Sequence, residues 1–432
     1  MLVLPLLGAA GVGSALSGRW SRAEASAARL DESKVLELDI AFFEARVVRD
    51  SFAARDHAQL ARLHLQRAPV GGTEDADLAQ AEAHARHSLA LRTTHNGEAL
   101  QVLASALMGR HRFGEARGVA ERLLAKDSTS RPARSLLGEI QLELGAYADA
   151  ARTFGSLLTV RGEPGVAPRY ARWEEIRGRP AAASRLLRDA RNQAALRHGM
   201  PRSQLAWFHW RIGDLALRQG RPDEAERELQ AGLALAPEDH RLLDGMARVA
   251  IARGRWRDAI DLGERATART LDLATLGMLS LSWEMLGDSA RSAAYDRAMD
   301  MALPQQPVGL DRQWAMLRLD RRRDVAAVLA KAREESRTRH DIYAWDLLAW
   351  ALYRSGAFRE ALDASARALA MNTRDATLYF HAGMIAAAAG DTVLARRRLR
   401  QALAINPRWH PSQPDDARTV LYPRTRTSAQ VD

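Results

Sequence analysis

The chain has 432 residues, of which 47% are hydrophobic and 27% charged, a balance that excludes wholesale disorder and collagen-like or coiled-coil composition. It contains no cysteine, so disulfides, thiolate metal sites, iron–sulfur clusters and cysteine nucleophiles are excluded. The net charge is +10, and arginine carries nearly all of the positive charge, since lysine occurs only at Lys34, Lys126 and Lys331. The arginines are interspersed with carboxylates, which favours ion pairs over the single cationic face that nucleic-acid binding usually requires.

The N-terminal stretch MLVLPLLGAAGVGSALS carries no charge and is short for a membrane-spanning helix. Such an apolar stretch, followed by the small residues Ala25-Ser26-Ala27, favours a secretory signal, although no basic residue precedes it. We therefore expect residues 1–27 to be a signal or hydrophobic N-terminal segment. If it acts as a signal, the protein is exported to the periplasm or the extracellular space; otherwise the protein is cytoplasmic.

Residues 28–96 are expected to form a helical hairpin region, a degenerate version of the units that follow. Two stretches that contain alanine, residues 58–63 and 81–83, flank a loop that contains Gly71 and Gly72. No stretch of the chain alternates with period two over more than a few residues, so no strands are expected.

A short turn recurs at a nearly constant interval along the rest of the chain. Seven of its eight positions are glycine: the sites are His111, Gly145, Gly178, Gly220, Gly254, Gly287, Gly356 and Gly390. Two antiparallel helices joined by a short turn need one residue with positive φ, which glycine adopts without a Cβ penalty. A further turn is expected at Arg321 or Arg322.

Pairs of small residues twelve positions apart straddle these turns. The pairs are Ala104 and Ala116, Gly138 and Ala150, Ala171 and Ala183, Gly213 and Ala225, Ala247 and Ala259, Ala349 and Ala361, and Gly383 and Ala395. Small residues let two helix backbones approach closely where they cross. In one unit Ser280 and Ser292 take these places.

These patterns resemble the tetratricopeptide repeat, whose unit of about 34 residues carries small residues on both helices, a turn and a closing proline. The best match runs from Arg211-Ile212-Gly213 through Gly220 to Leu235-Ala236-Pro237. The resemblance implies an all-α fold, an alpha-alpha superhelix of stacked antiparallel helix pairs, with about eight to nine units over residues 97–410. The unit near 307–341 is degenerate and could be one long helix, and the proline-bearing tail over 411–432 is expected to be flexible.

In this family the first helix of each unit lines a concave groove, and the resemblance implies a set of groove residues. Transferring the register gives Trp207, Trp210, Asp214, Arg218, Arg241, Asp244, Arg248, Tyr343, Asp346, Trp350, Tyr353, Phe380 and Met384. Aromatic side chains beside arginine and aspartate are typical of a peptide groove. The alternative for Trp207, Trp350 and Phe380 is that they pack between successive helices.

No common catalytic motif occurs, neither a metalloprotease His-Glu-x-x-His nor a nucleophile elbow, a phosphate-binding loop or a kinase signature. His84 and His87, near Glu82, share a helix face, but two histidines do not make a metal site and we expect a solvated pair. We therefore predict a non-catalytic scaffold without cofactor or metal, which binds a protein or peptide partner. The alternative is a nucleic-acid-binding helical repeat protein that uses its distributed arginines.

Overall fold

The computed structural model describes residues 32–69, 74–305 and 311–423. Within these ranges the regular secondary structure is helical and contains no strand, which confirms the all-α prediction. The chain divides into two compact units, an N-terminal unit of Met1–Ile140 and a C-terminal unit of Gln141–Asp432. This boundary lies inside a helix, whereas the sequence placed the domain boundary between residues 96 and 97.

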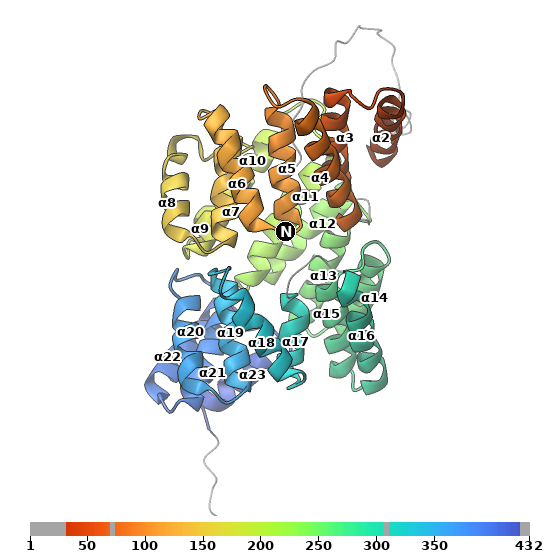
Figure 1. The fold of residues 1–432 in the computed structure, drawn as a ribbon. Helices are drawn as coiled ribbons and strands as arrows, with labels where there is room; N and C mark the ends of the chain where they lie inside the picture. The colour runs from red at the N-terminus through yellow and green to blue at the C-terminus, as the bar shows by residue number, and fades with distance from the viewer. Residues whose placement is uncertain (1–31, 70–73, 306–310, 424–432) are drawn as a thin grey trace, which may run out of the picture. The chain divides into compact units, whose positions relative to one another are not determined.

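The N-terminal unit consists of helical hairpins. Its helices are α2 (Glu32–Arg49), α3 (Ala54–Arg67), α4 (Glu74–Leu91), α5 (Gly97–Gly109), α6 (Phe113–Lys126) and most of α7 (Arg131–Glu143). Helix α3 packs on α4, and α5 packs on α6 (Figure 1). Helix α2 adds to the first hairpin, because its Ile40 is buried against Leu60 and Leu63 of α3. The predicted glycine loop of this region lies outside the described residues.

The C-terminal unit continues the same pattern. Its helices are α8 (Tyr147–Gly155), α9 (Ala167–Ile176), α10 (Pro180–Ala195), α11 (Arg202–Arg218), α12 (Pro222–Leu235), α13 (His240–Ala252), α14 (Trp256–Thr267), α15 (Leu273–Met285), α16 (Ser289–Ala302), α17 (Arg312–Asp320), α18 (Val325–Glu335), α19 (Ile342–Arg354), α20 (Phe358–Ala368), α21 (Ala376–Ala388), α22 (Thr392–Ile405) and α23 (Gln413–Leu421). Two short 3₁₀ helices, Leu158–Val160 and Leu303–Gln305, join them. We call the first helix of each hairpin helix A and the second helix B.

The predicted turn positions all adopt the left-handed conformation. The seven glycines have φ between +70° and +87°, and His111, which takes the place of glycine in the first turn, has φ +58°. Arg322 has φ +53° and joins α17 to α18, so the degenerate unit is a hairpin of two short helices and not one long helix. The turn pattern was therefore identified correctly even where glycine is missing.

The paired small residues lie where helices A and B cross. A Cβ atom on Gly213 would come within 2.8 Å of Leu229 Cγ, and one on Gly383 within 2.6 Å of Leu399 Cγ, so both sites require glycine. In the unit that has serines instead, the Ser280 hydroxyl donates to the Ser292 carbonyl oxygen at 2.9 Å. This hydrogen bond satisfies the Ser280 hydroxyl, which the close approach of the two helices buries.

The C-terminal unit closes on itself. The backbone N–H of His340 donates to the carbonyl of Leu144 at 3.1 Å, although the two residues are far apart in the chain. Further along, Asn406 Nδ2 donates to the carbonyl of Leu217 at 3.1 Å, across 189 positions. The loops that precede the late A helices therefore lie against the turns of the early hairpins.

Three turn glycines lie at these contacts. A Cβ atom on Gly145 would be 2.1 Å from the carbonyl carbon of His340, and one on Gly178 would be 2.4 Å from the carbonyl oxygen of Asn372. A Cβ atom on Gly220 would be 3.1 Å from the Cα atom of Asn406, whereas one on Gly356 would meet nothing within 4 Å. The first three glycines thus permit both the turn and the closure.

The prediction of a flexible tail over residues 411–432 is wrong for residues 413–421. These residues form α23, which packs on α21 and α22 and buries Ala417 and Leu421. Pro414 lies in the first turn of this helix, where a missing N–H costs nothing, so proline marks a helix start here. The helix covers the apolar side of the last repeat, as a terminal repeat requires.

None of the described helices is both long and apolar enough to cross a lipid bilayer.

Candidate functional site: the concave face of residues 141–432

The A helices of the C-terminal unit line its inner face. Successive A helices contact one another: α11 contacts α13, α15 contacts α17, and α17 and α21 both contact α19. Side chains that project from this side of the A helices therefore converge, and the predicted groove residues belong to these helices. We call this surface the concave face.

Ionised side chains of α9 and α11 meet on the concave face around Glu175. Its carboxylate accepts hydrogen bonds from the guanidinium of Arg211 and lies 2.5 Å from Arg218 Nη1 and 3.2 Å from Arg172 Nη1. Burial alone would raise the pKa of Glu175, but Arg218, Arg211 and Arg172 outweigh burial and lower the pKa. Glu175 is therefore a buried carboxylate held ionised by three arginines.

The predicted residues of α11 and α13 extend this network. Asp214 Oδ2 lies 3.0 Å from Arg218 Nη2, and Asp244 Oδ2 lies 2.8 Å from Arg248 Nε. Burial raises the pKa of Asp244 against the opposing effect of Arg248, whereas Arg218 and Arg211 outweigh burial at Asp214 and lower its pKa. The side chain of Arg248 remains 43% exposed, so this end of the network is open to a partner.

Aromatic side chains border the charged groups at two places. The guanidinium of Arg241 lies over the ring of Trp210, 5.7 Å from its centroid, while its nitrogens bond the carboxylate of Asp239. The ring of Tyr343 on α19 has two guanidiniums near it, Arg172 at 5.5 Å and Arg312 at 5.0 Å from the centroid. Tyr343 thus connects the late A helices to α9 across the closure.

The predicted groove residues of α19 and α21 lie mostly inside the fold. Trp350 is 1% exposed and Phe380 2%, so the alternative of packing between successive helices holds for both. The indole N–H of Trp350 donates to Asp320 Oδ1 at 2.8 Å, and its ring stacks on His381. Asp346, 1% exposed, accepts from His381 Nδ1 at 2.8 Å.

The remaining predicted positions differ in how far they are buried. Trp207 is 6% exposed and packs edge-on against Phe208, so it also belongs to the core. Tyr353 and Met384 are half-buried, and the ring of Tyr353 stacks on Trp350. The predicted residues that keep accessible surface beside the charged network are therefore Trp210, Asp214, Arg218, Arg241, Asp244, Arg248 and Tyr343.

The sequence prediction missed Arg172 and Glu175, which lie at the centre of the network. Arg172 has the ninth place and Glu175 the twelfth place of the unit that begins at residue 164. The same register gives Asp214 the ninth place and Tyr353 the twelfth place of their units. The signal was therefore present in the sequence.

The histidines considered as metal ligands lie in the N-terminal unit. Glu82 near them accepts hydrogen bonds from Arg86, Arg110 and Arg112 instead. His84 is not part of a solvated pair: its Nδ1 lies 2.9 Å from Nδ1 of His57, between α3 and α4. Among the described residues no group of three or more ligating side chains is arranged to hold a metal ion.

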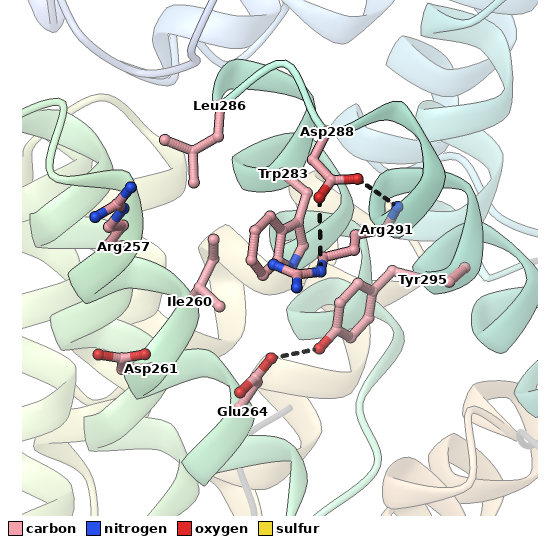
Figure 2. A pocket seen from close by; sticks show the side chains of 10 residues that line it. Arg257, Ile260, Asp261, Glu264, Trp283, Leu286, Asp288, Arg291 and Tyr295 are labelled. Carbon is pink, nitrogen blue, oxygen red and sulfur yellow. Dashed lines mark hydrogen bonds and ion pairs between the residues drawn. The ribbon is translucent and has the colours of Figure 1, made fainter.

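A separate, open hollow of about 920 Å³ lies on the side of the B helices, between α14 and α16. Figure 2 shows that its polar groups bond one another: Tyr295 donates to Glu264 at 2.8 Å, and Asp288 accepts from the backbone N–H of Arg291 at 2.9 Å. The guanidinium of Arg291 covers the ring of Trp283 at 4.3 Å. The hollow contains none of the predicted groove residues.

Comparison with known families identifies the repeat. The model of the tetratricopeptide repeat matches residues 102–164 and 210–272. The chain carries tetratricopeptide repeats. Both matched segments contain hairpins with the left-handed turns described above, at His111, Gly145, Gly220 and Gly254. The predicted resemblance and the predicted superhelix of helix pairs are thereby confirmed, and tetratricopeptide repeats typically mediate protein–protein interactions.

Solved structures that resemble this tetratricopeptide repeat chain share little sequence with it. The type IV pilus biogenesis factor PilW is 20% identical with a TM-score of 0.41, and the match covers 49% of this chain and 95% of PilW. The Cut9-Hcn1 hetero-tetramer of the APC/C is 13% identical (TM-score 0.34; 90% and 94% covered). A human IFIT1 dimer with PPP-AAAA is 14% identical (TM-score 0.45; 87% and 95% covered). No curated protein matches the chain.

Proposed function

We propose that this tetratricopeptide repeat chain is a non-catalytic scaffold that binds a protein segment along the concave face of residues 141–432. The observation that carries the proposal is the charged network of α9, α11 and α13, whose buried end is held by Glu175 and whose open end presents Arg248. Buried ion pairs fix the positions of the exposed groups, so that little side-chain entropy is lost on binding.

The partner segment is expected to carry both signs of charge. Asp214 and Asp244 accept from arginine or lysine of a partner, whereas Arg218 and Arg248 bind carboxylates in bidentate geometry. Trp210 and Tyr343 offer aromatic faces beside these groups, suited to apolar or cationic side chains. An extended peptide with mixed charges and at least one large apolar residue would satisfy this surface.

Site-specific photo-cross-linking in the native cell tests the proposal. A photoreactive amino acid at position 248 should form an adduct with the partner, and the same amino acid at the exposed position 396 on α22 should form none. Adducts from position 396 but not from position 248 would show that binding occurs elsewhere on the molecule.

The alternative function, nucleic-acid binding through distributed arginines, needs unpaired cations on one face. In the run Arg321-Arg322-Arg323, the side chain of Arg321 is paired within the fold, because it bonds Asp296 and also lies 3.0 Å from Glu284. Binding of random-sequence DNA that falls steeply with salt would favour this function over the scaffold.

We also propose that the scaffold acts outside the cytoplasm, because residues 1–27 have the composition of a secretory signal. Mass spectrometry of the N-terminus of the protein isolated from its native cell tests this proposal. A mature chain that begins shortly after Ala27 supports export, and an N-terminus at Met1 contradicts cleavage.

A further inference from the structure

A hollow rich in arginine lies on the C-terminal unit, and none of the predicted groove residues lines it. It has a volume of about 580 Å³ and is lined by Arg179, Arg185, Arg221 and Arg374, with Gln219 and the first turn of α10. No aspartate or glutamate is among the described residues that line it. We call it the arginine hollow.

Closure of the superhelix assembles the arginine hollow from distant parts of the chain. The side-chain amide of Gln219 donates to the backbone carbonyl of Arg374 at 2.8 Å, across 155 positions. Beside this contact, the carbonyl oxygen of Asn372 approaches Gly178 so closely that a Cβ atom there would be 2.4 Å away. Arg374 is thereby held against the start of α10 and the turn between α11 and α12.

The arginines of the hollow differ from those around them in lacking acidic partners. Neighbouring arginines pair within the fold, for example Arg177 with Glu174 at 2.8 Å and Arg191 with Glu228 at 2.8 Å. In contrast, Arg179, Arg185 and Arg374 form no ion pair with any residue that the structure describes. Arg221 is the exception in the hollow, since it pairs with Glu224.

Three guanidiniums around one hollow repel one another unless an anion lies between them. The start of α10 also favours an anion, because no side chain caps the helix at its N-cap residue Arg179, which Pro180 follows. Some later helices of the unit are capped by aspartate, as in α13 and α21, whereas α12 starts as α10 does, with an uncapped arginine followed by proline. The positive end of the α10 dipole therefore faces the same hollow as the arginines.

We propose that the arginine hollow binds a phosphate monoester. Guanidinium groups bind the tetrahedral dianion in bidentate geometry, and its double charge matches several arginines better than a single carboxylate does. The group can belong to a small phosphorylated metabolite or to a phosphorylated side chain of a partner protein. Because the hollow contains none of the concave-face residues, this site is separate from the proposed scaffold function.

Calorimetric titration of the full chain with O-phosphoserine and with a phosphoserine peptide, at constant ionic strength in chloride, tests the proposal. We expect saturable binding of at least one of them, and tighter binding of the peptide would indicate a phosphorylated partner as the source. The variant Arg185→Gln/Arg374→Gln should bind about tenfold more weakly, because it loses two charge-assisted contacts.

The matched control is Arg396→Gln/Arg397→Gln, which removes the same charge from exposed positions of α22. Its affinity should stay within about twofold of the wild type. Phosphoserine should also raise the melting temperature of the wild type and of the control, and should raise that of the Arg185/Arg374 variant less, because the ligand binds the folded state and stabilises it in proportion to its affinity. Absence of saturable binding, or equal weakening in both variants, would overturn the proposal.

Discussion

At the scale of single residues, the turn glycines fall into two classes that the sequence does not distinguish. Gly145 and Gly356 have the same role in the repeat and positive φ values of +73° and +87°. Only Gly145 has another backbone against it, that of His340. The repeat predicts the turn because a turn depends on neighbouring residues, but it does not predict which turns meet a loop from a distant repeat.

Substitution of these two glycines by alanine should separate the cost of a strained turn from the cost of a lost contact between distant repeats. Gly356→Ala should cost about 1–2 kcal/mol of unfolding free energy, the cost of a Cβ atom in the left-handed region. Gly145→Ala should cost about 3 kcal/mol or more, because the Cβ atom also forces the contact with His340 apart. Urea denaturation followed by circular dichroism measures both, and equal losses would argue against the closure contact.

The carboxylate of Glu175 gives a second prediction at this scale. Glu175→Gln leaves Arg172, Arg211 and Arg218 without their shared anion, so the unfolding free energy should fall by about 3 kcal/mol. The matched control is Glu360→Gln, which breaks an exposed pair with Arg333 and should cost less than about 1 kcal/mol. Thermal denaturation of both variants provides the measurement, and similar melting temperatures would contradict a structural role for the network.

At the scale of elements, the hairpin of α3 and α4 contains a cluster of histidines that the sequence analysis did not recognise. His84 on α4 lies against His57 on α3, and His64 and His87 are close to it. The only carboxylate bonded to one of these rings is that of Asp77, which accepts from His64 at 3.0 Å within the described residues. The sequence showed His84 and His87 on one helix face, but pairing with His57 depends on the register of two helices.

This cluster should make the N-terminal hairpin sensitive to acid. Burial, followed by the charges of His57, His64 and His87, lowers the pKa of His84 to about 4. Between pH 6.5 and 4 the unfolded chain binds a proton that the folded chain does not, so stability falls as pH falls through this range. The half-buried position limits the loss to about 2 kcal/mol.

Hydrogen exchange of peptides from residues 54–91 at pH 7 and pH 5 measures this sensitivity. Exchange relative to the intrinsic amide exchange rate at each pH should rise at pH 5 in the wild type, and His84→Gln should remove most of that rise. The exposed His198→Gln variant serves as control and should behave as the wild type does. A rise that persists in His84→Gln would show that another group is responsible.

At the scale of the whole molecule, the repeat predicted the local architecture but not how the C-terminal unit closes. Each hairpin follows from turn and small-residue positions within a single repeat, whereas closure depends on small rotations added over several repeats. Asp214, Arg218, Asp244 and Arg248, which the sequence predicted as groove residues, are members of the charged network. The burial of Trp350 and Phe380 was predicted only as an alternative, because exposure on a curved wall depends on the neighbouring repeats.

The closed superhelix of residues 141–432 brings α9 to Tyr343 and builds the arginine hollow, so its closure is the property to measure. The chain has no native cysteine, and Gln219→Cys/Arg374→Cys places one thiol on each side of the contact. A short bismaleimide should link the two within most native molecules and in few urea-unfolded ones, as detected by mass spectrometry of the digested protein. An intramolecular yield no higher in the native protein than in urea would contradict the closed superhelix.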